Sequence, residues 1–508
     1  MQLFFNRKYK TTRFWSSWIV RKIFKVYPYF IFHFIFANLI NSDRELLELY
    51  KKMMKNNLQL REKEQDSQEQ DRFGLIMFCI SLIFLVFAYG VAVGKYRVFP
   101  YKVINKVTSV AEKGLKQFRE DTKIELPWYL KRLDSPYPQA ILNTNKAYPG
   151  LNLLTGFSDK NTKLLIQILD MDGNILHEWD ADWKRILPNL EYLPERKIPK
   201  SRPGTTIHGI VMMENGDIVF NFSELGLVRL DVNGDVVWSL PYSTHHSVHL
   251  HDDGNLWVSG QKFHEKDDVE AISRFPNRKP PIWEYTIIEV SPDGKILNEW
   301  SIPEILRQNG YLGLLNLGTL KNWETIVGGD ADVLHANDVK PFPSDLEEGF
   351  FKRGDIMVSP RNINTVFVFN KETEKIKFVS TGLFVRQHDP DFIDGNTFSV
   401  FDNNNSAPKS ANPQSRILLI SAPENEVEVF FEGTKDTPFF TEVCGKNQWL
   451  PNGNVLITDC VNGRAFEVNR EGEIVWQYYN YVNEGMVGIV SEVQRLPLKY
   501  EQIFRKDK

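Results

Sequence analysis

The chain has 508 residues, a formal net charge of −4 and an ordinary globular composition, with 42% hydrophobic and 25% charged residues. This length accommodates one large domain with attachments, or roughly two or three smaller domains. The near-neutral charge and the scattered basic residues give no indication of nucleic-acid binding. The chain contains only three cysteines, so it is not a disulfide-rich scaffold.

The N-terminal region combines a basic leader with a long apolar segment. Residues 75–94 carry no charge and have the length of a membrane-spanning helix. Seven Lys and Arg residues among the first 25 predict a cytoplasmic N-terminus. Residues 26–40 fit a second span, an interfacial helix or a leader. One span would send the C-terminal part across the membrane, whereas two would keep it inside. Residues 43–61 favour a surface helix.

From about residue 148, short β-type runs alternate with turn signals, and one phrase recurs. It reads apolar strand, Asp or Asn, turn glycine, apolar strand, Trp, as in "RLDVNGDVVW". Each copy predicts a β-hairpin, with the glycine supplying positive φ in the turn. The copies, two of them degenerate, lie at 168–179, 229–238, 289–300, 368–378, 419–430 and 467–476.

A second hairpin precedes most of these copies, so that each unit contains four strands. Such units are typical of the blades of a propeller. The sequence therefore predicts an all-β, six-bladed β-propeller with an N-terminal helical, membrane-anchoring segment; a sandwich or a β-helix is the alternative. The expected regions are a basic N-terminus with a helix (1–73), a transmembrane helix (74–95), a membrane-proximal linker (96–147), the propeller (148–482) and a C-terminal tail packed on it (483–508).

Four of the ten histidines stand at matching positions in the repeat. His208 and His246 stand eight residues before a turn glycine, His388 stands seven before one, and His335 opens a unit that has a longer insert. The first strand of each blade lines the central channel, so we expect these side chains to converge at one mouth. Histidines that only tie strands together are the alternative. They would recur in every blade, but the first unit has none and the sixth has "CGKNQW" in this slot.

Imidazoles around a channel favour either metal or nucleophilic chemistry. A metal site would usually add carboxylate ligands, and a metal-dependent hydrolase stays open as a weaker alternative. The carboxylates close to the histidines in sequence are Asp338, Asp389 and Asp391. No cofactor is expected, and no Cys/His spacing indicates zinc. Cys444 and Cys460 flank one hairpin, where they are either neighbours across strands or two buried thiols.

The basic residues favour an anionic substrate. Arg361 follows His335 on the next strand, Arg386 precedes His388, and Lys446 takes the histidine slot of blade six. Fixed cations beside imidazoles suit a sulfate or phosphate ester.

Several motifs together resemble the arylsulfotransferase family over about residues 148–480. They include "HHSVHLHDDGN", "LHANDV", "MVSPRNINTVFVFN" and "RQHDPDFIDGN". The resemblance implies transfer of a sulfuryl group from an aryl sulfate donor to a phenolic acceptor, without a nucleotide donor. A histidine is sulfated transiently, which splits one displacement into two.

The resemblance also divides the site residues by role. It implies that His388 is the nucleophile and that His246, His335 and Arg361 hold the sulfuryl oxygens. One of these histidines could protonate the leaving phenolate. The choice between His246 and its neighbour stays open. The remaining candidates, expected to contact substrate, are His208, His245, Arg386 and Lys446.

The chain also departs from the bacterial enzymes of this family. Those enzymes are periplasmic, with a cleaved signal, an N-terminal β-domain and a disulfide near the site that has no clear equivalent here. This chain has a retained anchor, and the family habit favours a single span with the propeller on the exoplasmic side. The alternative function is a non-catalytic propeller that binds a protein or an anionic glycan at the membrane.

Overall fold

The structure is a computed structural model that describes residues 44–101, 103–104, 108, 126–158, 163–264, 282–319, 332–405 and 414–504. The basic leader and the apolar run at 26–40 lie outside the described residues. The chain divides into two units, Met1–Thr122 and Lys123–Lys508, each of which is considered by itself.

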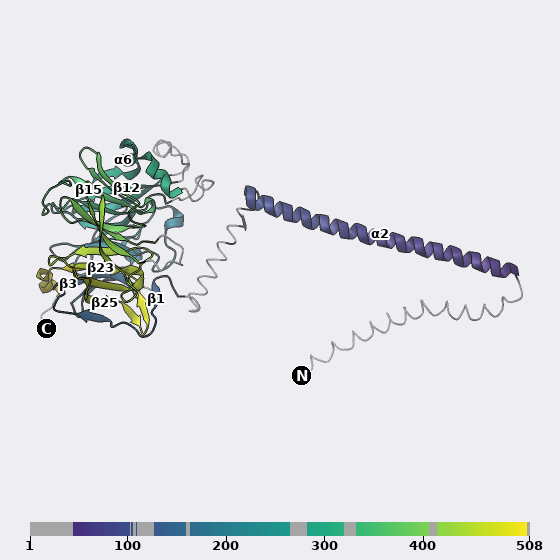
Figure 1. The fold of residues 1–508 in the computed structure, drawn as a ribbon, viewed down its shortest axis with the longest axis horizontal. Helices are drawn as coiled ribbons and strands as arrows, with labels where there is room; N and C mark the ends of the chain where they lie inside the picture. Colours follow the sequence, from purple (N-terminus) through teal and green to yellow (C-terminus); the bar gives the residue numbers. More distant parts are fainter. Residues whose placement is uncertain are drawn as a thin grey trace. The chain divides into compact units, whose positions relative to one another are not determined.

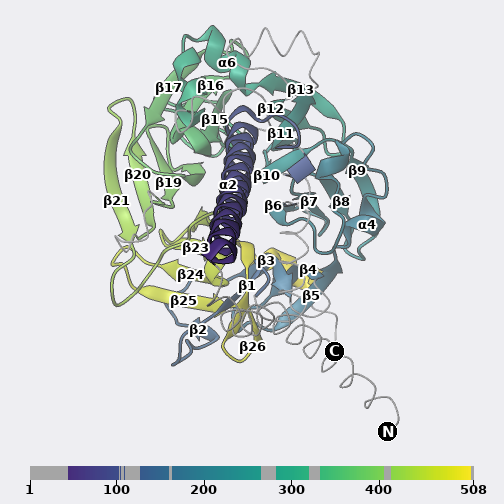
Figure 2. The same cartoon turned by 90° about the vertical axis from the view of Figure 1, so that its right-hand side faces the viewer.

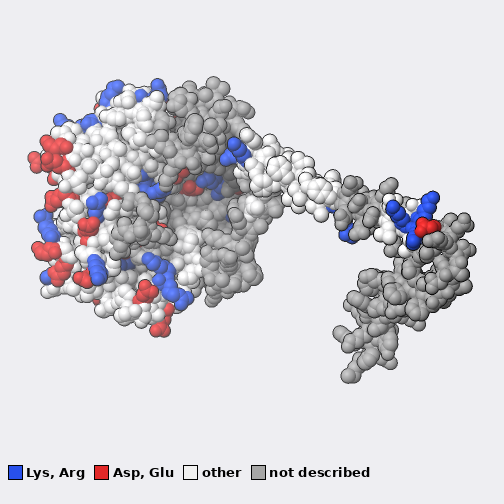
Figure 3. Space-filling model, turned by 45° about the vertical axis from the view of Figure 1, so that its right-hand side comes forward, with Lys and Arg blue, Asp and Glu red and all other residues white. Residues whose placement is uncertain are grey.

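The first unit contains a long helix, α2 (Arg44–Tyr96), which runs without interruption (Figure 1). The surface helix expected at 43–61 and the span expected at 75–94 are therefore parts of one helix. The intervening segment 61–72 is rich in Arg, Glu and Gln, which are good helix formers, and it contains no proline. Within the described residues, Arg72–Tyr96 is long and apolar enough to cross a membrane. Figure 3 shows the uncharged part of this segment as a white stretch with basic residues beside it.

The second unit is the predicted all-β, six-bladed propeller. Its antiparallel sheets follow one another in chain order around a ring (Figure 2). Blade 1, from the innermost strand outward, consists of β28 (Val490–Leu496), β3 (Leu151–Ser158), β4 (Lys163–Leu169) and β5 (Ile175–Asp180). Blade 2 consists of β6 (Ile207–Met212), β7 (Ile218–Phe222), β8 (Gly226–Leu230) and β9 (Val236–Leu240). Blade 3 consists of β10 (Thr244–Leu250), β11 (Leu256–His264), β12 (Ile282–Val290) and β13 (Ile296–Ser301).

The other three blades have the same order from the centre outward. Blade 4 consists of β14 (Ala336–Pro341), β15 (Asp355–Pro360), β16 (Thr365–Asn370) and β17 (Ile376–Thr381). Blade 5 consists of β18 (His388–Phe392), β19 (Thr397–Asp402), β20 (Arg416–Ser421) and β21 (Glu426–Glu432). Blade 6 consists of β22 (Lys446–Trp449), β23 (Val455–Asp459), β24 (Arg464–Val468), β25 (Ile474–Tyr479) and the added strand β2 (Ile141–Asn143).

Short elements connect and extend the blades. A small separate sheet contains β1 (Leu130–Arg132), β26 (Tyr481–Asn483) and β27 (Met486–Gly488). In the described part of the second unit, the short helices are α4 (Trp183–Ile186), α6 (Ile302–Gln308), α7 (Glu501–Phe504), η2 (Glu195–Lys197), η3 (Leu312–Thr319), η4 (Arg361–Ile363), η5 (Cys460–Asn462) and η6 (Leu498–Tyr500). Two strands thus fall in the segment 96–147 that was expected to be a linker.

The C-terminal segment closes the ring. Strand β28 pairs antiparallel with β3, so residues from 483–508 supply the inner strand of the first blade. A chain that begins at β3 has no inner strand for blade 1 until its C-terminal end returns. The segment expected to be a packed tail is therefore an integral part of the sheet.

The recurring tryptophan joins neighbouring blades. In three blades its indole N–H donates to a carbonyl in the outer hairpin turn of the next blade, as buried tryptophans generally require a hydrogen-bond partner. These bonds join Trp179 to Asp231, Trp238 to Pro292 and Trp476 to Met171, each at 2.9 Å. The last bond links blade 6 to blade 1. Apolar side chains fill the space between blades, for example Phe351, Phe378 and Phe398.

The beginning of the inner strand carries a β-bulge in five of the blades. The register shifts fall between Ile207 and Ile210, His245 and Val248, Ala336 and Asp338, His388 and Asp391, and Val490 and Glu492. A bulge re-aims a side chain and commonly lies beside a site. Three residues here adopt positive φ although they are not glycine, namely His246 (58°), His335 (46°) and Asp389 (44°). Such a conformation costs of order 1–3 kcal/mol and persists only where its surroundings fix it.

Candidate active site

Five histidine rings gather where the inner strands of blades 2 to 5 begin. We call them the imidazole cluster: His208 on β6, His245 and His246 on β10, His335 before β14, and His388 on β18. His246 lies at its centre. Its ring centroid is 4.7 Å from that of His208, 4.1 Å from His245, 5.0 Å from His335 and 5.7 Å from His388. The structure therefore brings together all four histidines of the repeat, with His245 beside them.

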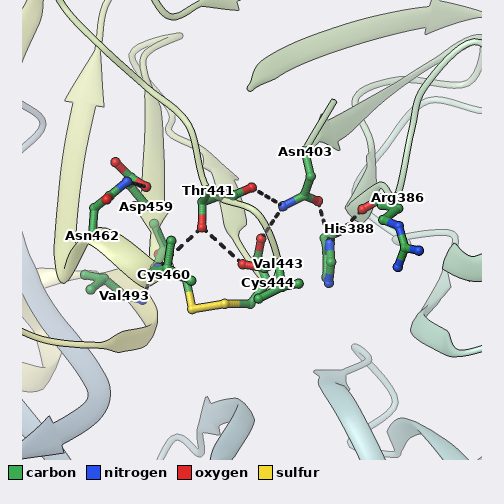
Figure 4. The surroundings of a disulfide bond; sticks show 12 residues. Arg386, His388, Asn403, Thr441, Val443, Cys444, Asp459, Cys460, Asn462 and Val493 are labelled. Atoms are coloured by element: carbon green, nitrogen blue, oxygen red, sulfur yellow. Dashed lines mark hydrogen bonds between the residues drawn. A yellow bond between two sulfur atoms is a disulfide. The ribbon is translucent and has the colours of Figure 1, made fainter. Parts of the chain in front are cut away.

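Two neighbouring oxygen atoms hold the His388 ring in one tautomer. Its Nδ1 lies 2.6 Å from Oδ1 of Asn403 and 3.1 Å from the carbonyl of Arg386 (Figure 4). A carbonyl can only accept, so Nδ1 carries the proton and Nε2 carries the lone pair. Among the described residues, Nε2 has no hydrogen-bond partner, although the side chain is 3% exposed. An unpaired buried nitrogen of this kind is available to attack a substrate.

A second chain of contacts runs through His335. Its Nδ1 pairs with Oδ2 of Asp332, and its Nε2 lies 2.8 Å from Nε2 of His246. Because the carboxylate accepts from Nδ1, neutral His335 accepts at Nε2 and His246 donates. Tyr285 donates to the other oxygen of Asp332 at 2.6 Å. This arrangement holds a proton between two imidazoles and backs it with a carboxylate.

Two arginines border the cluster. Arg361 begins η4, and its backbone N–H donates to the carbonyl of His335 at 3.1 Å. Burial lowers the pKa of Arg361 to about 10, so the guanidinium remains charged. Arg386 precedes His388 and has a positive φ of 56°. Its charge contributes to the lowered pKa of Arg361, so both cations act on the same region.

The imidazole cluster is neutral at neutral pH. Burial, together with the charge of Arg361, holds the pKa of His388 well below its usual value. Burial also lowers the pKa of His208 and of His245 to about 3, and lowers the pKa of His246 and of His335. Burial opposes ionisation of Asp332, but its bond with His335 outweighs this and lowers its pKa. A neutral imidazole is the form that can act as nucleophile or base.

Lys446 begins β22, the inner strand of blade 6, and belongs to a second group of polar side chains. Its Nζ is 2.7 Å from Asp389 and 3.7 Å from Asp338. Although burial opposes it, Asp389 and its neighbours raise the pKa of Lys446 well above the usual value. Close by, Lys340 pairs with Asp391, and His249 lies 2.8 Å from Asp338. We call Asp338, Lys340, Asp389, Asp391 and Lys446, with His249, the ion-pair layer. The charge of Lys446 is thus already compensated.

The ion-pair layer lines a cavity of about 410 Å³ in the channel, with Lys340, Asp389 and Lys446 among its walls. This cavity is lined by the second halves of the inner strands, including residues 248–252 and 492–497. The inner strands thus present imidazoles at their beginning and paired charges further along.

Cys444 and Cys460 form a disulfide, with 6.0 Å between their Cα atoms. A disulfide therefore lies near the candidate site, where no sequence pattern clearly indicated one. The sequence left this pairing open because Cys444 stands before β22 and Cys460 begins η5, and only the folded blade brings them together. The carbonyl of Cys444 also accepts from the amide of Asn403 at 2.7 Å, which ties the disulfide to the surroundings of His388 (Figure 4).

Two groups of side chains within the described residues have donor atoms close enough to hold a metal ion. The first is His245, His246 and His335, and the second is His249, Asp338 and Asp389. In the first group, two of the nitrogens are already hydrogen-bonded to each other. In the second, the ammonium of Lys446 provides the positive charge. His246 and His335 in the first set, and Asp389 in the second, are thus engaged within the protein, whereas Nδ1 of His245 has no hydrogen-bond partner among the described residues.

Sequence reasoning did not identify Asp332, Tyr285 or Asn403. Asp332 stands three residues before His335, and this short spacing was a usable signal. Tyr285 lies on β12 and Asn403 follows β19, and neither stands next to a repeat histidine in the sequence. Only the fold brings these two side chains into the site.

A buried set of neutral imidazoles bordered by arginines has the chemistry that suits an anionic ester. The sequence model of the arylsulfotransferase (ASST) family matches residues 209–481. The chain belongs to the arylsulfotransferase family, whose general activity is aryl sulfotransfer between a sulfate donor and a phenol acceptor.

More distant similarities concern the fold only. A protein of unknown function from Bacteroides caccae is 14% identical, with a TM-score of 0.42 over 68% of this chain and 98% of that chain. A virginiamycin B lyase from Staphylococcus aureus is 14% identical, with a TM-score of 0.31 over 55% of this chain and 72% of that chain. These similarities are too weak to carry a functional argument. No curated protein matches the chain.

Proposed function

We propose that the chain moves a sulfuryl group from an aryl sulfate ester to a phenolic acceptor through a transient sulfohistidine at His388. The observation that carries this proposal is the state of the His388 ring. Its Nδ1 proton is bound by Asn403, and its Nε2 is buried without a partner among the described residues. A lone pair held in this way is ready for nucleophilic attack.

In the first half-reaction, Nε2 of His388 attacks the sulfur of the donor. The N–S bond forms while the bond between sulfur and the aryl oxygen breaks, and the phenolate leaves with the electron pair. In the second half-reaction, the acceptor oxygen attacks the same sulfur, and Nε2 regains its lone pair. The cationic side chains that would stabilise the sulfuryl oxygens are Arg361 and Arg386.

The His246–His335 pair handles the proton. In its neutral form the pair takes the proton of the acceptor phenol as that oxygen attacks, and it becomes an imidazolium beside the Asp332 carboxylate. It then gives this proton to the phenolate that left in the first half-reaction, so the full cycle gains and loses none. His208 and His245 complete the wall of neutral rings and exclude water. Lys446 is assigned to the ion-pair layer instead of to the substrate.

We infer that the propeller lies on the exoplasmic side of the membrane, anchored by one span. Disulfides persist in oxidising compartments and are rare in the cytosol, so the Cys444–Cys460 bond supports this side. The basic leader supports a cytoplasmic N-terminus. Protease added to right-side-out vesicles should digest the propeller, whereas protection would place it inside.

The function is tested with the detergent-solubilised full chain, a chromogenic aryl sulfate and a phenol acceptor. Wild type should release the chromogenic phenol and sulfate the acceptor, while His388→Asn should lose at least about 10³-fold in kcat. The matched control is His251→Asn, because His251 follows the end of β10 and lines the channel cavity. Acceptor sulfation that survives in His388→Asn would reject His388 as the nucleophile. Binding of the donor without any release would favour the non-catalytic alternative.

A further inference from the structure

Asn403 connects the His388 ring to a separate part of the chain. It follows β19 directly, its side chain is fully buried, and His388 pairs with Phe401 on this same strand. The amide therefore lies beside the ring as a consequence of the sheet register.

Two hydrogen bonds that the amide nitrogen donates determine the orientation of this side chain. Nδ2 donates to the carbonyl of Thr441 at 2.9 Å and to the carbonyl of Cys444 at 2.7 Å (Figure 4). Rotating the amide by half a turn would break both bonds and place an oxygen against two carbonyls. Oδ1 consequently faces His388 Nδ1, and the ring must donate to it.

The two carbonyls belong to a segment that is itself fixed. Cys444 has a φ of 55°, a left-handed conformation that an L-residue rarely keeps without support. The backbone N–H of Thr441 donates to Ser415 Oγ at 3.1 Å. The disulfide joins Cys444 to Cys460, next to blade 6. These contacts define where the Cys444 carbonyl points.

We propose that Asn403 is the positioning residue that keeps the proton on Nδ1 of His388, and that the disulfide-closed segment Thr441–Cys444 keeps Asn403 in this orientation. The inference rests on the proposed role of His388. Without Asn403 Oδ1, only the longer contact of Nδ1 with the Arg386 carbonyl, at 3.1 Å against 2.6 Å, would hold this proton. The ring would then populate more of the tautomer that carries its proton on Nε2, which cannot attack sulfur. In serine proteases, a catalytic histidine held in the wrong tautomer lowers kcat by about 10⁴-fold.

The test compares Asn403→Leu with Asn403→Asp in the full chain. Asn403→Leu keeps the volume but removes the acceptor, so kcat should fall at least about 100-fold while KM for the donor stays within about twofold. Asn403→Asp restores an acceptor for Nδ1 but sets its other oxygen against the carbonyls of Thr441 and Cys444, so it should recover only about tenfold of that loss. A leucine variant with wild-type kcat, or a loss that resides only in KM, would overturn the proposal.

The tautomer itself is read by nitrogen-15 NMR of histidine-labelled protein. In wild type, Nε2 of His388 should give the signal of an unprotonated ring nitrogen, assigned by its disappearance in His388→Asn. In Asn403→Leu this signal should move toward the protonated position. An unchanged signal contradicts the proposal even if the protein transfers no sulfuryl group, which separates this test from that of the proposed function. If Asn403→Leu does not fold, Asn403→Ala removes the same acceptor and carries the same readouts.

The segment is tested by reducing the disulfide in wild type. Reduction, verified by thiol labelling, should lower kcat and shift the His388 signal in the same direction as Asn403→Leu, and reoxidation should reverse both. Cys79→Ser is the matched control, because this cysteine lies in α2 and should respond as wild type does. Verified reduction that changes neither kcat nor the signal would reject the part played by the disulfide.

Discussion

The imidazole cluster and the ion-pair layer occupy successive positions on the same inner strands, yet they differ in whether their buried polar atoms have partners. His388 and Asp389 are consecutive residues. The first leaves Nε2 without a partner among the described residues, while Asp389 accepts from Lys446 and from the backbone and side chain of Asn447. His388 thus keeps an unpaired lone pair on Nε2, whereas Asp389 is hydrogen-bonded to the neighbouring blade.

This difference follows from what burial costs. A buried charge needs a partner, and the ion-pair layer supplies partners from adjacent blades. A buried neutral ring without a partner also costs free energy, and such groups are expected where chemistry is performed. Substitutions in the ion-pair layer should therefore change stability first, and those in the imidazole cluster should change activity first.

The largest expected effect on stability comes from Lys446→Met. It would leave the Asp389 and Asp338 carboxylates uncompensated, so the free energy of unfolding should fall by about 3–5 kcal/mol in denaturant titrations. Lys499→Met is the control: its ammonium lies 3.8 Å from an exposed Glu214, and the loss should stay below about 1 kcal/mol. Unchanged stability with a raised KM would instead make Lys446 a contact for the anionic substrate.

Asp332→Asn should act mainly on activity. The amide no longer stabilises an imidazolium at His335, so kcat should fall by about 10²-fold, as expected for loss of acid–base assistance. Tyr285→Phe removes only the hydroxyl bond to the other oxygen of Asp332 and should cost less than about tenfold. Equal losses in the two variants would argue that the carboxylate matters only for packing. Steady-state rates with one donor and acceptor pair provide the comparison.

The neutral histidines predict a pH dependence of stability. The folded pKa of His208 is about 3, against an ordinary value of 6.5. Below pH 6.5 the unfolded chain binds a proton that the folded chain does not, so stability is present above this pH and is lost as the pH falls toward 3. Between pH 7 and pH 5, His208→Asn should lose about 2 kcal/mol less than wild type, from about 1.4 kcal/mol per pH unit. Identical losses in denaturant titrations at both pH values would show that His208 is protonated in the folded state.

The smallest expected effect is that of a chelator. His246 Nε2 and His335 Nε2 bind one proton between them, so removing metal should leave the transfer rate within about 20%. The rate is measured before and after dialysis against the chelator, together with the metal content of the purified chain. A loss that zinc restores would favour the metal-dependent alternative and would reassign His245, His246 and His335 as ligands.

The repeat made the propeller predictable, because glycine turns and tryptophans recur at fixed places whatever the strand sequence between them. It also indicated that His208, His246, His335 and His388 share a position. The bulges that turn these residues inward were not predictable, since positive φ at His246 or His335 has no signal in the residue type.

Other features depended on contacts distant in sequence. The inner strand of blade 1 comes from the far end of the chain, and no local pattern marks residues 490–496 as the partner of 151–158. Asn403 and Tyr285 become site residues only through sheet register. The repeat placed Lys446 at the histidine position of blade 6 and suggested a substrate contact. Its ammonium is instead paired with Asp389, which lies on the neighbouring blade.

The most direct test is to trap the covalent intermediate. The full chain is mixed with an aryl sulfate in the absence of acceptor, quenched within one turnover under alkaline conditions, digested and analysed by mass spectrometry. The account predicts a burst of one equivalent of phenol and one added sulfuryl group on the peptide that contains His388, at Nε2. A burst with the sulfuryl group on another residue, or transfer to acceptor without any sulfated peptide, would contradict it.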